Sequence, residues 1–95
     1  MLGRLLQTAA MFAALGDETR LGLLQRLSAE GPMSITRLTQ KAGVTRQAVT
    51  RHLDVLETAG LVRSRRQGRE RVWQRAIPAR WDVALERFRK IVEAP

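Results

Sequence analysis

At Gly60 the sequence changes from the periodicity of helices to the alternation of strands. Two short runs with an extended pattern follow, at residues 61–65 and 71–75. Between them, Gln67-Gly68 has the composition of a tight hairpin turn. An isolated two-stranded hairpin is only marginally stable in water, so we expect this one to pack against helices.

Before Gly60, apolar residues recur at helical spacing in four separate segments. The last three segments each follow a side chain that can cap a helix N-terminus, and glycines separate them. The predicted helices cover about residues 3–15, 18–29, 35–42 and 46–59, with caps at Asp17, Ser34 and Thr45. A fifth helix is predicted over about residues 78–93, and Pro78 opens it.

This order of elements predicts the fold class. A short helix, a tight turn at Gly43 and a second helix make a helix-turn-helix, and a hairpin directly after it makes the wing of a winged helix. We therefore predict a mainly α fold with a two-stranded β-hairpin, in the order α-α-α-α-β-β-α. Residues 1–95 are expected to form a single winged helix-turn-helix domain that includes the first and last helices.

The helix predicted at about residues 46–59 separates into an apolar side and a polar side. At about 100° per residue, Leu53 and Leu56 fall within about 40° of Val49, which makes these three the buried stripe. Arginine pairs bidentately with guanine in the major groove and glutamine with adenine, while threonine reaches phosphate or a thymine methyl. The candidate DNA-contacting residues of this helix are Thr45, Arg46, Gln47, Thr50 and Arg51. Every amphipathic helix has a polar face, but the turn before this one and the basic hairpin after it favour DNA.

Three further residues of the same helix fit this interpretation less simply. Asp54 and Glu57 near its end indicate that the C-terminal half lifts out of the groove. His52, the only histidine, lies about 60° from the centre of the apolar side. It either packs against the protein or touches a phosphate, and we keep it among the candidate DNA contacts. A metal site needs several ligands, so no metal role is expected for it.

Positive charge is concentrated in the hairpin. The net charge is +8, and residues 61–75 hold six Arg and one Glu. Such a balance favours a polyanionic partner, above all nucleic acid. A solvated basic hairpin is the simpler alternative, but arginine without lysine favours a bidentate grip on phosphate. Arg63 and Arg75 lie near the base of the hairpin and are expected only to add to its field. The wing residues expected to contact DNA lie near the turn: Arg66, Arg69 and Arg71.

Three segments together resemble the ArsR family of small winged-helix transcription regulators. They are Phe12–Leu24, Val44–Val62 and Arg65–Arg69, and the resemblance covers about residues 9–76. It implies a homodimeric repressor that binds a near-palindromic operator. Metal-sensing members carry a cysteine pair on the short helix, or zinc ligands that include histidine on the last helix. This chain has no cysteine and its last helix has no histidine, so neither a metal nor a cofactor is expected.

The first and last helices each carry an apolar stripe, and that of the last helix spans about 120°. A domain of this size has limited core area to cover both stripes, and in the resembled family these helices pair across a two-fold axis. Packing of both within one chain is the alternative. A two-fold dimer places two recognition helices about 34 Å apart, one turn of DNA. The candidate dimerisation residues are Leu5, Phe12, Trp81, Leu85, Phe88 and Val92.

We therefore expect a sequence-specific DNA-binding transcriptional regulator, a homodimeric repressor of an inverted-repeat operator. A recognition helix at about residues 46–59 and a basic wing at about residues 62–75 are expected to make the contacts. A winged-helix protein-interaction adaptor and an RNA-binding module are the alternatives. An adaptor rarely needs a basic wing, and RNA binding favours exposed aromatic side chains for base stacking.

Other classes of function are not expected. The sequence has no nucleophile motif and no glycine-rich phosphate loop, so we do not expect an enzyme. No apolar run reaches the ~18 residues that a membrane span needs, and the start of the chain does not look like a signal peptide. Together with the absence of cysteine, this predicts a cytoplasmic protein without a membrane partner.

Overall fold

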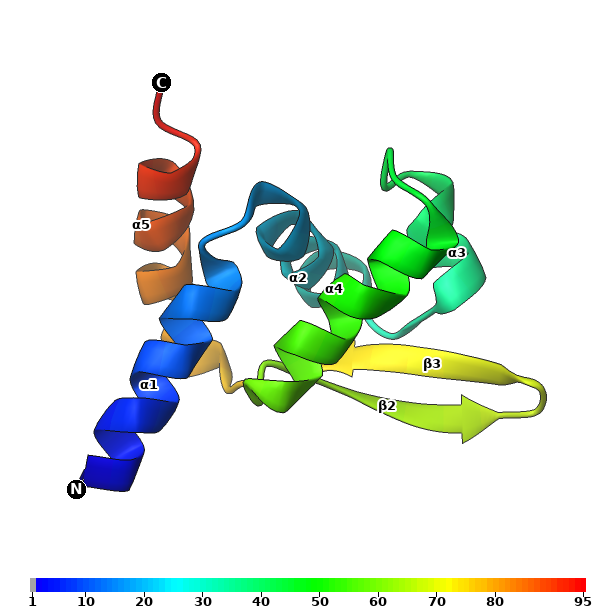
Figure 1. Cartoon of the computed structure of the whole chain (residues 1–95), viewed down its shortest axis with the longest axis horizontal. Coiled ribbons are helices and arrows are strands. Elements are labelled where there is room, and N and C mark those ends of the chain that lie inside the picture. Colours follow the sequence, from blue (N-terminus) through cyan, green and yellow to red (C-terminus); the bar gives the residue numbers. More distant parts are fainter. Residues whose placement is uncertain (1) are drawn as a thin grey trace.

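The computed structural model describes residues 2–95, which form five α-helices, one short 3-10 helix and three strands. The elements are α1 (Leu2–Leu15), α2 (Glu18–Glu30), β1 (Met33–Ser34), α3 (Ile35–Gln40), α4 (Arg46–Thr58), β2 (Val62–Gln67), β3 (Glu70–Arg75), η1 (Ala79–Trp81) and α5 (Asp82–Val92). Figure 1 shows α1 and α5 at one end of the molecule and the β2–β3 hairpin extending from the other. The predicted fold class, mainly helical with a hairpin wing after the fourth helix, is confirmed.

The helix N-termini form where capping side chains were predicted. The Asp17 carboxylate accepts a hydrogen bond from the Arg20 backbone N–H at 3.0 Å, and that bond holds the pKa of Asp17 below its usual value. Ser34 and Thr45 cap α3 and α4 in the same way, with their hydroxyl oxygens 3.2 and 3.1 Å from the capped backbone nitrogens. Each cap satisfies a backbone donor that has no partner within its own helix.

Truncating the cap of α4 tests how much this local signal contributes. Thr45→Ala is expected to lower the free energy of unfolding by about 1 kcal/mol, because the N–H of Ala48 loses its acceptor. Urea unfolding followed by circular dichroism measures the change. Thr58→Ala, an exposed substitution at the other end of the same helix, is the matched control and should have little effect. Equal effects of the two variants would contradict the role of the cap.

The sheet has three antiparallel strands in the order β1-β3-β2, so the prediction of a two-stranded hairpin is one strand short. The extra strand is only two residues long, and Met33 pairs with Trp73 of β3. Two residues are too few to show the alternation of a strand. For this reason the sequence predicted only a loop and the helix cap Ser34 here. The hairpin turn also lies one residue later than predicted, because Gln67 pairs with Glu70 and leaves Gly68 and Arg69 as the loop.

The turn itself uses the freedom of glycine. Gly68 has φ 63°, and no residue other than glycine has a positive φ within residues 2–95. Glycine at the first loop position, followed by a residue with negative φ, is the pattern of a type II′ turn, whose twist matches that of the flanking strands. The tip of the wing is therefore a tight two-residue turn that presents the Arg69 side chain.

The hydrophobic core lies between α2, α3, α4 and the sheet. Val49, Leu53 and Leu56 are fully buried, which confirms the buried stripe predicted for α4. Trp73 of β3 is 1% exposed and closes the core from the sheet side, so the hairpin packs on the helices as expected. The remaining most deeply buried side chains are Leu15, Leu21, Leu24, Leu27, Met33, Leu38, Leu61 and Val62.

The two terminal helices contribute less to this core. Only Met11, Ala14 and Leu15 of α1 are buried, and none of the residues 82–92 of α5 is. The helices meet through the Phe12 and Phe88 rings, whose centroids are 5.3 Å apart. No helix within residues 2–95 is both long and apolar enough to cross a membrane.

Helix α5 starts later than predicted, and Arg75 fixes its approach to the sheet. Pro78 directly precedes the short helix η1, and α5 itself begins at Asp82. The Arg75 guanidinium donates to the carbonyl oxygens of Ile77 and Pro78, both at 2.9 Å, and pairs with Asp82. Arg75 was expected only to add to the field of the wing, but its contacts join the end of β3 to the start of α5.

Candidate nucleic-acid interface

Helix α4 lies across the molecule with one side on the core and the other in solvent (Figure 1). Gly43, with φ 71°, allows the turn that brings α4 back over α3. On the outer side, Gln47 and Arg51 are exposed and one helical turn apart, so they project together. This is the geometry predicted for a pair of base-reading side chains.

The N-terminal half of α4 and the wing share a recess of about 210 Å³. It brings together five of the predicted DNA-contacting residues, two from α4 and three from the wing: Arg46, Thr50, Arg66, Arg69 and Arg71. The Thr50 hydroxyl donates to the Arg46 carbonyl oxygen at 3.0 Å, which holds it against its own helix. The Glu70 carboxylate also lines the recess, but the four guanidinium groups outnumber it and are suited to a phosphate group.

The wing is held beside α4 by contacts at two points. Near the tip, the Thr36 hydroxyl of α3 donates to the Glu70 carboxylate at 2.9 Å. Further down, the Glu57 carboxylate of α4 accepts hydrogen bonds from the backbone N–H and the hydroxyl of Ser64, at 3.0 and 2.9 Å. Glu57 therefore bonds to the wing, which explains its presence on a helix whose other end is basic.

Arg71, one of the predicted DNA contacts of the wing, also contacts several side chains of its own chain. Its guanidinium lies over the Trp73 ring, 4.5 Å from the centroid, and donates to the Ser64 hydroxyl at 2.9 Å. It also pairs with Glu57 at 3.5 Å. Arg66, which lies directly opposite Arg71 in the sheet, and Arg69 in the turn form no ion pair or side-chain hydrogen bond within residues 2–95. Of the three predicted wing contacts, Arg66 and Arg69 are therefore the two whose guanidinium groups are not engaged by other side chains of the described residues.

His52 lies on the flank of α4 that faces away from Arg46 and Thr50. Its Nδ1 is 3.4 Å from Nη1 of Arg20 in α2, and it is half-buried. The Arg20 Nε in turn donates to the Ala14 carbonyl oxygen at 2.6 Å. Of the two accounts left open for His52, this position favours the packed histidine, since the residue does not line the recess between α4 and the wing.

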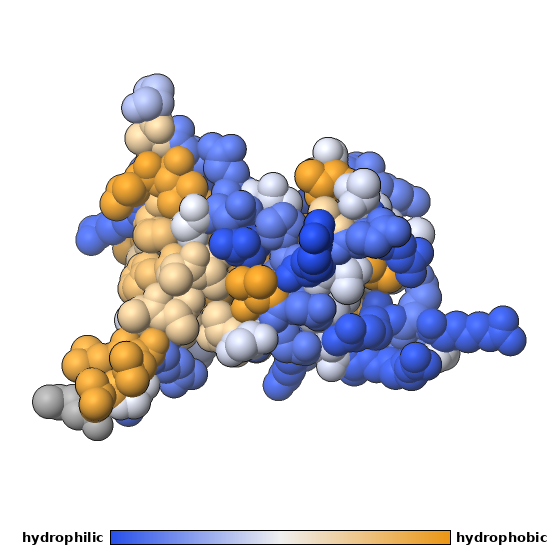
Figure 2. All heavy atoms as spheres, viewed as in Figure 1, coloured by the Kyte–Doolittle hydropathy of each residue, from blue (hydrophilic) through white to orange (hydrophobic). Residues whose placement is uncertain are grey.

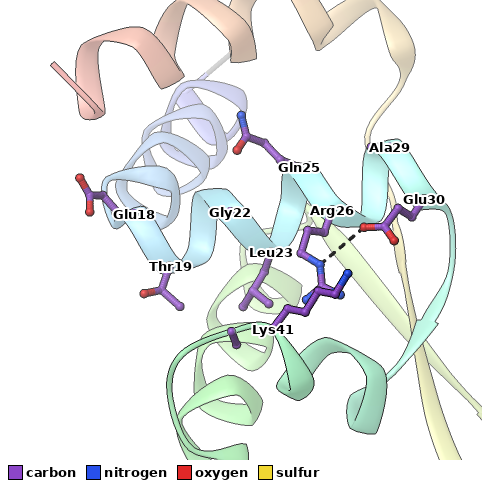
Figure 3. A pocket seen from close by; sticks show the side chains of 10 residues that line it. Glu18, Thr19, Gly22, Leu23, Gln25, Arg26, Ala29, Glu30 and Lys41 are labelled. Atoms are coloured by element: carbon purple, nitrogen blue, oxygen red, sulfur yellow. Dashed lines mark ion pairs between the residues drawn. The ribbon is translucent and has the colours of Figure 1, made fainter.

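A larger hollow of about 570 Å³ lies between α2 and the turn after α3 (Figure 3). Its arginine, Arg26, pairs with Glu30 at 3.6 Å and donates to the Leu38 carbonyl oxygen at 3.0 Å. These bonds tie α2 to the end of α3. None of the predicted site residues lines this hollow, and its polar contacts serve to fix the turn that precedes α4.

The polar and apolar parts of the surface lie over different elements. Figure 2 shows hydrophilic side chains over α4 and the hairpin, and hydrophobic ones over α1 and α5. The exposed apolar residues of α1 include Leu2, Leu5 and Leu6, each more than 60% exposed. By contrast, Trp81, Leu85, Phe88 and Val92 are partly buried against the core of their own chain.

Sequence reasoning missed the residues that hold the wing in place. Thr36, Glu57 and Ser64 belong to three different elements, and each acts through a partner at least seven residues away. A signal of that kind has no local pattern. The only hint was that an acidic residue at position 57 did not suit a helix expected to lie along DNA.

Comparison with known proteins gives a consistent picture. A family model described as a helix-turn-helix domain matches residues 15–65, more than half of the chain. An uncharacterized HTH-type transcriptional regulator of Bacillus subtilis is 45% identical over 69 residues, which cover 66% of this chain and 75% of the relative. The arsenical resistance operon repressor of Escherichia coli is 36% identical over 59 residues, 62% of this chain and 50% of that protein.

Solved structures share the fold over nearly the whole chain. The homodimeric winged helix-turn-helix DNA-binding domain of a possible ArsR-family regulator from Mycobacterium bovis has a TM-score of 0.74 and 25% identity. The match covers 97% of this chain and 80% of that one. An ArsR-like transcriptional regulator from Rhodococcus has a TM-score of 0.70 and 33% identity, over 98% of this chain and 99% of that one.

Proposed function

This chain belongs to the ArsR family of winged helix-turn-helix transcriptional regulators, and we propose that it acts as a homodimeric repressor on an inverted-repeat operator. The observation that carries this proposal is the recess in which Arg46 and Thr50 of α4 meet Arg66 and Arg69 of the wing. Two elements of a basic chain thereby offer one continuous surface to a polyanion.

In this function, α4 enters the major groove and the wing follows the phosphate backbone. Arg51 and Gln47 face outward from the first half of α4, the part of a recognition helix that reaches the base edges. Arg66 and Arg69 supply phosphate contacts, which position the protein without reading sequence. Repression follows when the operator overlaps a promoter and the bound protein excludes polymerase.

The exposed apolar side of α1 supports the dimer. Leu5 and Leu6 are 62% and 63% exposed, and Ile91 of α5 is 72% exposed. An exposed apolar patch of this kind marks a protein–protein contact. A two-fold axis at the end formed by α1 and α5 would set the two α4 helices one turn of DNA apart, about 34 Å. The homodimeric state of the mycobacterial domain agrees with this arrangement.

The proposed function is tested by selecting bound duplexes from a random pool that includes the DNA upstream of the protein's own gene. An inverted repeat with half-sites about one helical turn apart is the expected product. Failure to enrich any duplex at low salt would contradict the proposal and favour an adaptor that binds protein.

The salt dependence of binding tests the phosphate contacts of the wing. Each neutralised phosphate contributes about −0.9 to the slope of log binding constant against log salt. Arg69→Ala is therefore expected to make the slope shallower by about one to two and to weaken all duplexes about equally. Arg80→Ala removes the same charge from η1, outside the recess, and serves as the control. An unchanged slope for Arg69→Ala would exclude Arg69 from the interface.

A further inference from the structure

Glu57 joins the last turn of the recognition helix to the first strand of the wing. One carboxylate oxygen, Oε2, accepts hydrogen bonds from both the backbone N–H and the hydroxyl of Ser64, at 3.0 and 2.9 Å. The other acidic side chain of this helix, Asp54, is exposed and forms no ion pair within residues 2–95. The two acids therefore differ in what they contact, although they lie one turn apart.

The contact continues from Ser64 into the second strand of the wing and the core. The second oxygen of Glu57, Oε1, is 3.5 Å from Nη2 of Arg71, and the same nitrogen donates to the Ser64 hydroxyl at 2.9 Å. Ser64 lies opposite Trp73 in the sheet register, and Arg71 stacks on the Trp73 ring. Since Trp73 is almost completely buried, the network connects α4, β2 and β3 to the core.

We propose that Glu57 is a positioning residue that sets the angle of the wing relative to the recognition helix, so that Arg66 and Arg69 reach the DNA backbone. The inference rests on the proposed DNA-binding function. Arg66 lies directly opposite Arg71, a member of the network, and Arg69 lies in the turn two residues before Arg71. Arg66 and Arg69 are therefore close to the residues that fix the wing. A wing held at Ser64 and Arg71 keeps these two arginines in one position relative to α4.

Simple electrostatics makes the opposite prediction for this residue, which gives a sharp test. A carboxylate beside a polyanion repels it, so deleting an acid from α4 should strengthen DNA binding. Glu57→Ala and Asp54→Ala each remove one negative charge from the same helix and each introduce the same side chain. Asp54→Ala is expected to leave operator affinity unchanged or to raise it. Glu57→Ala is expected to lower it by roughly 3- to 10-fold, the scale of losing one or two phosphate contacts.

Double variants separate a positioning role from a general loss of stability. In the Glu57→Ala background, Arg69→Ala should cost much less affinity than it does in the wild type, because the wing no longer places Arg69 on the backbone. Arg51→Ala should keep its full cost, because α4 itself is intact. Glu57→Gln, whose amide oxygen can still accept from the Ser64 N–H, should recover part of the loss. Equal costs of Arg69→Ala in both backgrounds would overturn the proposal.

A measurement without DNA keeps this inference separate from the proposed function. The heteronuclear NOE of the Gly68 and Arg69 amides is expected to fall in Glu57→Ala and to stay at the wild-type value in Asp54→Ala. Ser64→Ala, which removes one of the two hydrogen bonds from the wing side, should give an intermediate value and replaces Glu57→Ala if that variant does not fold. Unchanged wing amides would refute the positioning role even if the wild type binds its operator. Failure of the wild type to bind any duplex would refute only the DNA-binding function.

Discussion

Leu5→Arg is expected to convert the dimer into a monomer and to weaken operator binding by about 10²–10⁴-fold, the range by which a second linked contact raises affinity. Leu5 lies on the outward side of α1 and is 62% exposed, so the substitution leaves the core of the monomer intact. Two arginines brought together across the two-fold axis repel each other and lose water without gaining a partner. Each protomer then binds one half-site alone.

Val83→Arg is the matched control for this substitution. Val83 is 66% exposed on α5, on the side away from the stripe that includes Phe88 and Val92. The Val83→Arg substitution adds the same positive charge as Leu5→Arg, and this charge by itself favours DNA binding. Sedimentation velocity reports the oligomeric state, and fluorescence anisotropy with a labelled operator reports affinity. A Leu5→Arg protein that remains a dimer would place the interface elsewhere.

Arg51→Ala has the second largest expected effect, a loss of about 1–3 kcal/mol in specific binding with relaxed preference at one base pair of each half-site. The physical reason is the bidentate pair between a guanidinium and the edge of guanine, which no neighbouring side chain replaces. Arg51 is exposed and makes no ion pair or hydrogen bond to another side chain within residues 2–95, so its loss does not disturb the fold.

The measurement for Arg51 compares the selected duplex with duplexes that carry single base substitutions. The variant should lose discrimination at one position and keep it at the others. Arg87→Ala, an exposed arginine of α5, removes the same charge outside the proposed interface and controls for the field of the protein. A uniform loss across all duplexes would make Arg51 a phosphate contact instead of a base-reading residue.

The helices and their first turns could be predicted from the sequence because the signals are local. Asp17, Ser34 and Thr45 act on backbone groups three residues away, and the sequence shows both partners at once. The buried side of α4 follows from helical geometry alone, which is why Val49 and Leu53 were assigned correctly. Once the buried side of α4 is known, the opposite side of the helix must be the exposed polar one.

The contacts that complete the site depend on the arrangement of elements and could not be predicted in the same way. Strand β1 exists only because Met33 meets Trp73, 40 positions further along the chain. The charge run of the wing predicted Arg71 as a DNA contact but did not show that Arg71 also contacts Glu57 and Trp73. His52 remained open for the same reason, because its neighbour Arg20 comes from a distant helix.

Because α5 packs only loosely on its own chain, its stability is expected to depend on protein concentration through the proposed dimer. None of the residues 82–92 is fully buried in one chain, so contacts with the second protomer of the proposed dimer would add to the free energy that holds α5 in place. Ordering of α5 and association are then one linked equilibrium. Since the amount of dimer rises with the square of the monomer concentration when monomer predominates, operator occupancy responds more steeply than in proportion to the amount of protein. A small DNA-binding domain would in this way acquire a threshold in its response to protein concentration.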